Sequence, residues 1–148
     1  FYAVYAVKAG IDPDYGQVYY RSSTNRLDLD TLSKSINKDF FPGANFNATN
    51  TLVVTWDRVR EQDKTYNVNT YQAVLVTDIN NQSYVMYSYA ECDSTAAQVF
   101  VPLSPDGRHY QSWDGSFNTI APMKFDKTQT NIGVPGVLIW KVYDRNAK

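Results

Sequence analysis

The sequence predicts a mainly β fold, an antiparallel β-sandwich with one amphipathic helix packed on it at about residues 29–40. Three observations lead to this prediction: several stretches alternate apolar and polar residues with period two, turn-forming residues separate them, and one stretch has helical spacing. The chain has 148 residues, 43% of them hydrophobic and 20% charged, which suits one soluble domain. At this length, folding buries roughly 70% of the unfolded chain's surface, so a core forms without disulfide bonds.

The first part of the chain reads as two strands and a helix. Residues 2–8 and 17–21 have strand character, and the turn-rich segment 10–16 separates them. In the segment that follows, apolar residues recur at helical spacing on one face, and Asp28 is placed to be the N-cap of the helix. These apolar residues are Leu29, Leu32, Ile36 and Phe40.

The helix is expected to end near Phe40, before Pro42 and Gly43. Its other positions are polar, which predicts that a single stripe packs on a sheet and that the rest faces solvent. The polar positions expected to be exposed are Lys34, Asn37 and Lys38.

From residue 51 onward the period changes from helical to two, which predicts the strands of the main sheet. The segment 78–82 contains two asparagines, which tolerate the positive φ of a tight hairpin turn. Turn-forming residues recur through 104–136, and strands at such spacing indicate a sandwich or barrel rather than a parallel sheet. The expected strands cover residues 52–57, 71–77, 85–89, 99–101 and 137–143.

The net charge and the absence of targeting signals limit the classes of partner that we expect. The net charge of -1 gives no basic field for nucleic acid or anionic lipid, and no apolar run is as long as a membrane span. The chain shows no signal peptide and opens in the middle of a strand pattern, so we expect a single domain, 1–148, cut from a longer protein. The one cysteine, Cys92, is expected to be a buried inert thiol or to pair with a cysteine outside this segment.

Residues capable of catalysis are scarce. His109 is the only histidine, so a serine or cysteine nucleophile would have to use it as a base, and a typical zinc site cannot be assembled. Neither a nucleophile elbow nor a glycine-rich phosphate loop is present.

Two pairs of carboxylates are candidates for catalysis or calcium binding. Asp12 and Asp14 flank Pro13 in a turn, and Asp28 and Asp30 lie at the expected helix start, where aspartate is common for structural reasons. Calcium near Asp12 and Asp14 remains an alternative, but the segment lacks the alternating ligands of an EF-hand loop. We therefore expect no cofactor and no enzyme activity.

Two sequons for N-linked glycosylation fall in segments that the pattern places in exposed loops. They begin at Asn47, after the helix, and at Asn81, in the hairpin. In a secreted eukaryotic protein both would carry glycans, which mark faces that are unavailable to a partner.

The strands also carry a resemblance to the nidogen-type extracellular (NIDO) domain, which occurs in matrix and cell-surface proteins such as nidogen, alpha-tectorin and mucin-4. The resemblance covers roughly residues 10–143, and its motifs occur in the order that the family shows. They are the early strand in 12–21, the central block of 53–59, 69–78 and 83–89, and the closing segment 131–142. The chain departs from the family at 91–93, where a tryptophan is usual, and at 96–99, which lacks a glycine.

This resemblance implies a secreted protein or an ectodomain that works in cell–matrix adhesion or matrix assembly by binding other extracellular proteins, with no catalytic residues. Exposed aromatic and charged loop residues are the expected contacts, whereas Trp56, Asn69, Gln72 and Trp140 are expected to be framework. The rival functions are a carbohydrate-binding β-sandwich that stacks sugars on tyrosine and tryptophan, a carboxylate-dependent hydrolase, and a structural spacer. The expected contacts are Tyr15, Arg108, His109, Tyr110 and Trp113.

Overall fold

The structure is a computed structural model. At residues 100–102, 110–112 and 142–143 it describes the backbone alone. The residues it describes are 11–62, 68–80, 82–91, 100–102, 110–112 and 132–143.

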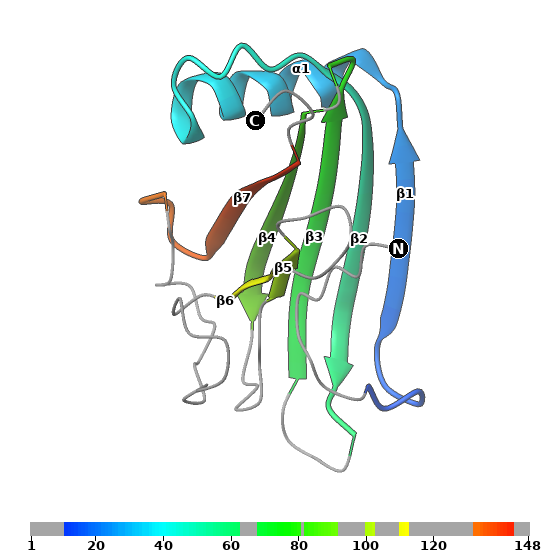
Figure 1. Ribbon diagram of the computed structural model, residues 1–148. Coiled ribbons are helices and arrows are strands. Elements are labelled where there is room, and N and C mark those ends of the chain that lie inside the picture. The colour runs from blue at the N-terminus through cyan, green and yellow to red at the C-terminus, as the bar shows by residue number, and fades with distance from the viewer. Residues whose placement is uncertain are drawn as a thin grey trace.

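Two antiparallel sheets and one helical segment make up the described fold. The large sheet has five strands in the order β1-β2-β3-β4-β7, and β5 pairs with β6 in a separate two-stranded sheet (Figure 1). The mainly antiparallel β fold with one helix is therefore confirmed. The elements are β1 Gln17–Ser23, α1 Arg26–Lys34, a π-helical turn Ser35–Phe40, β2 Ala48–Arg60, β3 Val68–Asp78, β4 Ser83–Glu91, β5 Phe100–Pro102, β6 Tyr110–Ser112 and β7 Val137–Tyr143.

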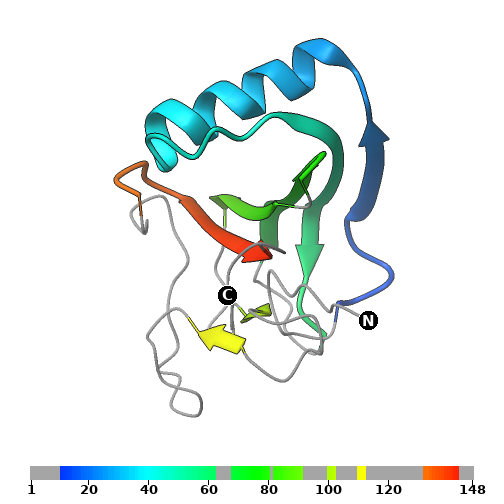
Figure 2. The ribbon, with the colours of Figure 1, turned by 45° about the horizontal axis from the view of Figure 1, so that its top comes forward.

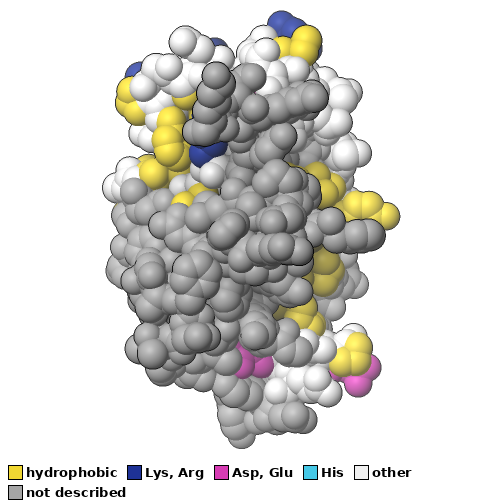
Figure 3. All heavy atoms as spheres, viewed as in Figure 1, with side chains coloured by type: hydrophobic (Ala, Val, Ile, Leu, Met, Phe, Trp, Pro, Cys, Tyr) yellow, Lys and Arg dark blue, Asp and Glu magenta, His cyan; other side chains and the backbone are white. Residues whose placement is uncertain are grey.

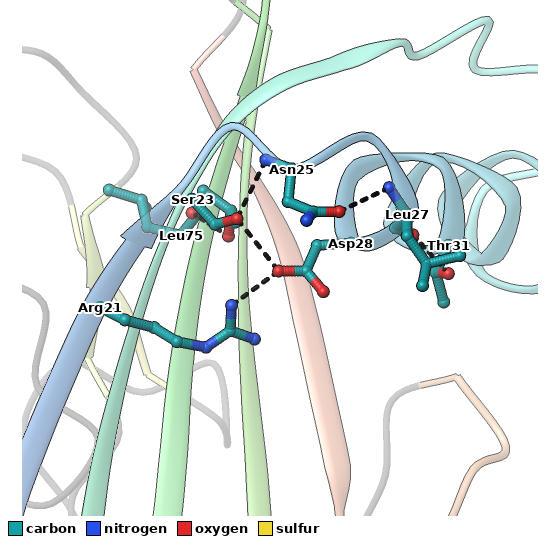
Figure 4. Close-up of polar contacts among 8 residues, drawn as sticks. Arg21, Ser23, Asn25, Leu27, Asp28, Thr31 and Leu75 are labelled. Atoms are coloured by element: carbon teal, nitrogen blue, oxygen red, sulfur yellow. Dashed lines mark hydrogen bonds and ion pairs between the residues drawn. The ribbon is translucent and has the colours of Figure 1, made fainter.

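The helix begins earlier than expected, and the predicted N-cap is wrong. Asn25 is the N-cap, and its side-chain oxygen accepts a hydrogen bond from the Leu27 backbone N–H at 2.9 Å. Asp28 lies in the first turn instead, where its carboxylate accepts hydrogen bonds from Arg21 and Ser23 (Figure 4). The helical segment ends at Phe40 as expected, although its last residues form a wider π-helical turn.

The expected apolar stripe of the helix covers one face of the large sheet. Leu29 and Ile36 are buried against a cluster that also receives side chains from β2, β3, β4 and β7, with Leu32 and Phe40 packed at its border. Figure 2 shows α1 lying across this face, while β6 lies on the opposite side of the sheet. The remaining buried members of the cluster are Phe46, Ala48, Val76, Tyr84 and Ile139.

The other face of the sheet carries a row of aromatic rings. Trp56 stacks on Tyr71 at 4.9 Å between ring centroids, and Trp140 meets Tyr87 edge-on at 6.0 Å. Asn69 is buried and Gln72 donates to Thr55 Oγ1 at 2.8 Å, so the residues expected to be framework do have that role. Burial raises the pKa of Tyr87, whose buried hydroxyl has no hydrogen-bond partner among the described residues.

The β3–β4 hairpin forms where the sequence predicted it, and Asp78 holds its turn. Asn80 does not have positive φ; instead, the Asp78 carboxylate accepts hydrogen bonds from the backbone N–H groups of Asn80 and Gln82, each at 2.8 Å. Strand β6, which the sequence pattern did not predict, lies within the segment 104–136 in which turn-forming residues recur. The expected strand at 2–8 lies outside the described residues, and in the described part no helix is long and apolar enough to span a membrane.

Candidate protein-contact surface along strand β1

Strand β1 lies at the edge of the large sheet and exposes an unusual amount of apolar surface. Among the described strands it pairs with β2 alone, so no described strand lies along its outer backbone edge. Tyr20 exposes 81% of its surface, and Val18 and Tyr19 about half of theirs. We call Tyr15, Val18, Tyr19, Tyr20 and Leu52 the β1 surface; all five are exposed.

The register of the sheet explains how these side chains are directed. Val18 and Tyr20 pair with Trp56 and Val54, so they lie on the aromatic face, whereas Tyr19 lies on the helix face. Figure 3 shows hydrophobic side chains gathered along the side of the molecule where β1 lies. The strand contains no proline or lysine that would discourage edge-to-edge pairing.

A β-bulge at Arg58 marks the lower end of this surface. The β2–β3 register shifts between Trp56 and Val59, and Arg58 adopts φ +52°, a left-handed conformation that costs a non-glycine residue roughly 1–2 kcal/mol. The Arg58 backbone N–H donates to Thr70 Oγ1 at 3.1 Å, which fixes the bulge on β3. The Arg58 side chain is left exposed to solvent.

The turn before β1 fits closely against this bulge. Gly16 has φ +75°, and a Cβ atom placed on it would lie 2.5 Å from the Arg58 carbonyl oxygen. The Asp12 N–H donates to the Arg60 carbonyl at 3.0 Å, so the start of the turn is also attached to β2. Only glycine therefore allows the turn to approach the bulge this closely.

Tyr15 and Arg60 complete this corner. The Arg60 guanidinium carbon lies 3.7 Å from the centroid of the Tyr15 ring, a cation–π contact that holds the ring in place. We call Tyr15, Gly16, Arg58 and Arg60 the Arg58 corner. They surround a shallow pocket of about 330 Å³, which is also lined by Gln17, Tyr19, Asp57 and Val68.

The corner offers groups that suit the recognition of another protein. An exposed guanidinium binds carboxylates with directed hydrogen bonds, and tyrosine offers a large apolar face with a polar tip. Within the described ranges, no three histidine, cysteine, aspartate or glutamate side chains come together as a metal site would need.

One carboxylate of each pair has a structural partner. Asp12 Oδ1 accepts a hydrogen bond from the Asp14 N–H at 3.0 Å, which is the expected role of aspartate in a turn. The hydrogen bonds from Arg21 and Ser23 hold the pKa of Asp28 below its ordinary value. Asp28 therefore ties β1 to α1 (Figure 4).

The structure brings one expected contact residue, Tyr15, into the β1 surface. Tyr110 begins β6, where only the backbone is described. Sequence reasoning missed Tyr20, Arg58 and Arg60. One signal in β2 was available for the two arginines: the apolar residues occupy mostly even positions up to Trp56 and an odd position at Val59, as a bulge requires. Four expected site residues lie outside the described part: Asn81, Arg108, His109 and Trp113. Cys92 lies outside it as well.

Comparisons with known proteins give the family of the chain. The family model of the nidogen-like domain matches residues 2–144. The chain is 42% identical to alpha-tectorin of Gallus gallus and 37% identical to that of Homo sapiens, in each case over 82 residues, which are 54% of this chain and 4% of the relative. Alpha-tectorin of Mus musculus is 35% identical over the same length.

No solved structure gives a significant match to the chain. The family match, by contrast, spans nearly all of its 148 residues. The chain therefore belongs to the nidogen-like domain family, which indicates a module of an extracellular protein.

Proposed function

We propose that this chain is an interaction module in cell–matrix adhesion or matrix assembly, and that it binds another extracellular protein through the β1 surface and the Arg58 corner. The observation that carries the proposal is the exposed tyrosine pair on an edge strand, in which Tyr20 is 81% accessible. Tyrosine and arginine are enriched at protein interfaces, and an unpaired strand edge offers backbone groups to an added strand.

The chemistry of the surface favours an extended segment of the partner. Such a segment would pair with the outer edge of β1 and cover Val18 and Tyr20 with its side chains. An acidic residue near its end would meet the exposed Arg58 guanidinium at the lower end of the strand. The expected partner is therefore a protein with an exposed extended segment that carries a carboxylate.

The carbohydrate-binding alternative has less support at this surface. Sugar rings stack on free aromatic faces, and one face of Tyr15 is already covered by the Arg60 guanidinium. The Tyr19 hydroxyl donates to the Gln17 side chain, so this polar tip has an internal partner. Tyr20 alone offers a largely uncovered ring, whereas a protein segment would use the whole strand.

Binding to matrix laid down by cultured cells tests the proposal. Tyr20→Ser in the secreted protein is expected to reduce retention on this matrix severalfold, because it removes the most exposed aromatic of the surface. The matched control is Ile79→Ser, since Ile79 is 78% exposed in the β3–β4 hairpin at the other end of the sheet. Equal retention of wild type and Tyr20→Ser contradicts the proposal, and a sugar-specific signal on a glycan array favours the alternative.

The role of Arg58 has its own pair of variants. Arg58→Asn removes the charge while keeping a residue that tolerates positive φ, so it is expected to weaken retention without unfolding the bulge. Arg58→Lys keeps the charge but not the two-pronged hydrogen bonding, and an intermediate loss is expected. Retention of Arg58→Asn at the wild-type level removes the acidic segment from the proposal.

A further inference from the structure

Asn47 is held in an outward direction by contacts from the helical segment. It is exposed, whereas its neighbours Phe46 and Ala48 are buried. The Asn37 side chain donates to the Phe46 carbonyl and accepts from the Phe46 N–H, both at 2.7 Å, and Ser33 Oγ accepts from the Ala48 N–H at 2.9 Å. The backbone on both sides of Asn47 is therefore fixed, and its side chain faces solvent.

A groove of about 710 Å³ lies beside Asn47, along the helical segment. Asp30, Lys34 and Lys38 contribute exposed charged groups that can exchange hydrogen bonds with sugar hydroxyls. The full lining consists of Asp30, Ser33, Lys34, Asn37, Lys38, Asp39, Phe46 and Asn47.

We propose that Asn47 carries an N-linked glycan whose first sugars lie in this groove. The sequon Asn47-Ala48-Thr49 has the required hydroxyl residue and no proline, and an extracellular protein passes through the compartment where such sugars are attached. This goes beyond the proposed function, because it assigns a modification to a different part of the molecule.

The attachment is a balanced group transfer from a lipid-linked oligosaccharide diphosphate. The side-chain amide nitrogen of Asn47 forms a bond to the anomeric carbon of the first sugar and loses one proton. The bond from that carbon to the diphosphate oxygen breaks, and the lipid diphosphate leaves with its electron pair. No oxidant or reductant is needed.

The position of the sequon keeps the glycan away from the proposed contact surface. Asn47 lies directly before Ala48, which pairs with Asp78 at the hairpin end of the sheet. Arg58 lies toward the opposite end of the same strand, roughly 35 Å away at the usual rise per residue of a strand. The glycan would therefore cover the helix and leave the Arg58 corner open.

Threonine variants of the sequon test the attachment with little change to the fold. In protein secreted from eukaryotic cells, Thr49→Ala is expected to lower the mass by one glycan, whereas Thr49→Ser keeps the glycan. The serine variant also retains the hydroxyl that donates to the Thr77 carbonyl at 3.3 Å. Asn47→Gln provides a second glycan-free variant.

Peptide mapping after enzymatic glycan release completes this test, because release converts a glycosylated asparagine to aspartate. Aspartate at position 47 in the wild type, and its absence in Thr49→Ala, supports the site. Asparagine at position 47 in the secreted wild type overturns it.

Amine labelling tests the place of the sugars. If they lie in the groove, Lys34 and Lys38 should react severalfold more slowly with an amine reagent in Thr49→Ser than in Thr49→Ala. Equal reactivity of these lysines in the two variants overturns the location in the groove.

Discussion

At the helix-covered end of the sheet, Phe46 and Ile36 expose 2% and 1% of their surface, whereas on β1 Tyr20 exposes 81%. Both regions use strands with large apolar residues, but only the first receives a second layer from the described residues. There, even the polar side chains of Asn37 and Ser33 hold the backbone in place. The difference shows that one end of the molecule is built for stability and that the β1 edge leaves apolar surface available for contact.

The strongest test of this comparison is to remove a buried ring from the helix-covered end. Phe46→Ala is expected to lower the free energy of unfolding by about 3–5 kcal/mol, because it leaves a cavity in the cluster. Leu27→Ala is the control: Leu27 is 76% exposed on α1, and its loss should change stability by less than about 0.5 kcal/mol. Urea denaturation of both variants checks this, and similar losses would mean that the cluster does not carry the stability.

A glycine comparison tests how tightly the Arg58 corner is built. Gly16→Ala is expected to destabilise the protein by about 3 kcal/mol, because the new Cβ meets the Arg58 carbonyl and the backbone has positive φ. Gly43→Ala is the matched control: Gly43 has φ +85° near the end of the helical segment with nothing within 4 Å, so only about 1 kcal/mol is expected. If thermal unfolding shows that the two variants are destabilised equally, the turn does not fit closely against the bulge.

On the aromatic face of the large sheet, the Tyr87 hydroxyl is a buried polar group without a hydrogen-bond partner among the described residues. Tyr87→Phe is expected to raise the free energy of unfolding by about 1 kcal/mol, since it removes a buried hydroxyl without a described partner. Because burial raises the pKa of Tyr87, the folded protein keeps this proton after the unfolded chain has lost it. Wild type should therefore lose stability above about pH 10, the ordinary tyrosine value, more steeply than Tyr87→Phe.

Denaturation curves at neutral and alkaline pH provide the measurement for Tyr87. A destabilised Tyr87→Phe variant would mean that the hydroxyl has a stabilising partner.

The smallest effect is expected at the contact that joins the two regions. The pKa of Asp28 is lowered by Arg21 and Ser23, so its contribution is present above the ordinary aspartate pKa, about 3.9, and is lost as pH falls through the lower folded value. Asp28→Asn should therefore be slightly less stable than wild type at pH 7, and the difference should vanish in strong acid. Asp30→Asn, two residues further along α1, is the control, and an unchanged difference across the pH range contradicts the assignment.

Much of the fold could be predicted from patterns between near neighbours. The period of two in β2, β3 and β4 determined which side chains share a face, because successive residues of a strand point to opposite sides. The spacing from Leu29 to Phe40 likewise gave the buried stripe of the helix and its end. The family resemblance came from the same strands and is confirmed.

The candidate site was largely missed because it depends on contacts between distant segments. The exposure of Tyr20 follows from the edge position of β1, and strand order is set by pairing across the chain. Asn37 was expected to be an exposed polar residue, but it is half-buried and holds the Phe46 backbone. Asp28 was expected to cap the helix, whereas Asn25 does so and leaves Asp28 to bind Arg21.

The sequence by itself therefore determined the alternation, the helix stripe, the hairpin and the family, since each is written in residues close together along the chain. Only the tertiary structure decided the edge position of β1, the bulge at Arg58 and the outward direction of Asn47. These features arise because backbone groups far apart in sequence must find hydrogen-bond partners in one packed arrangement.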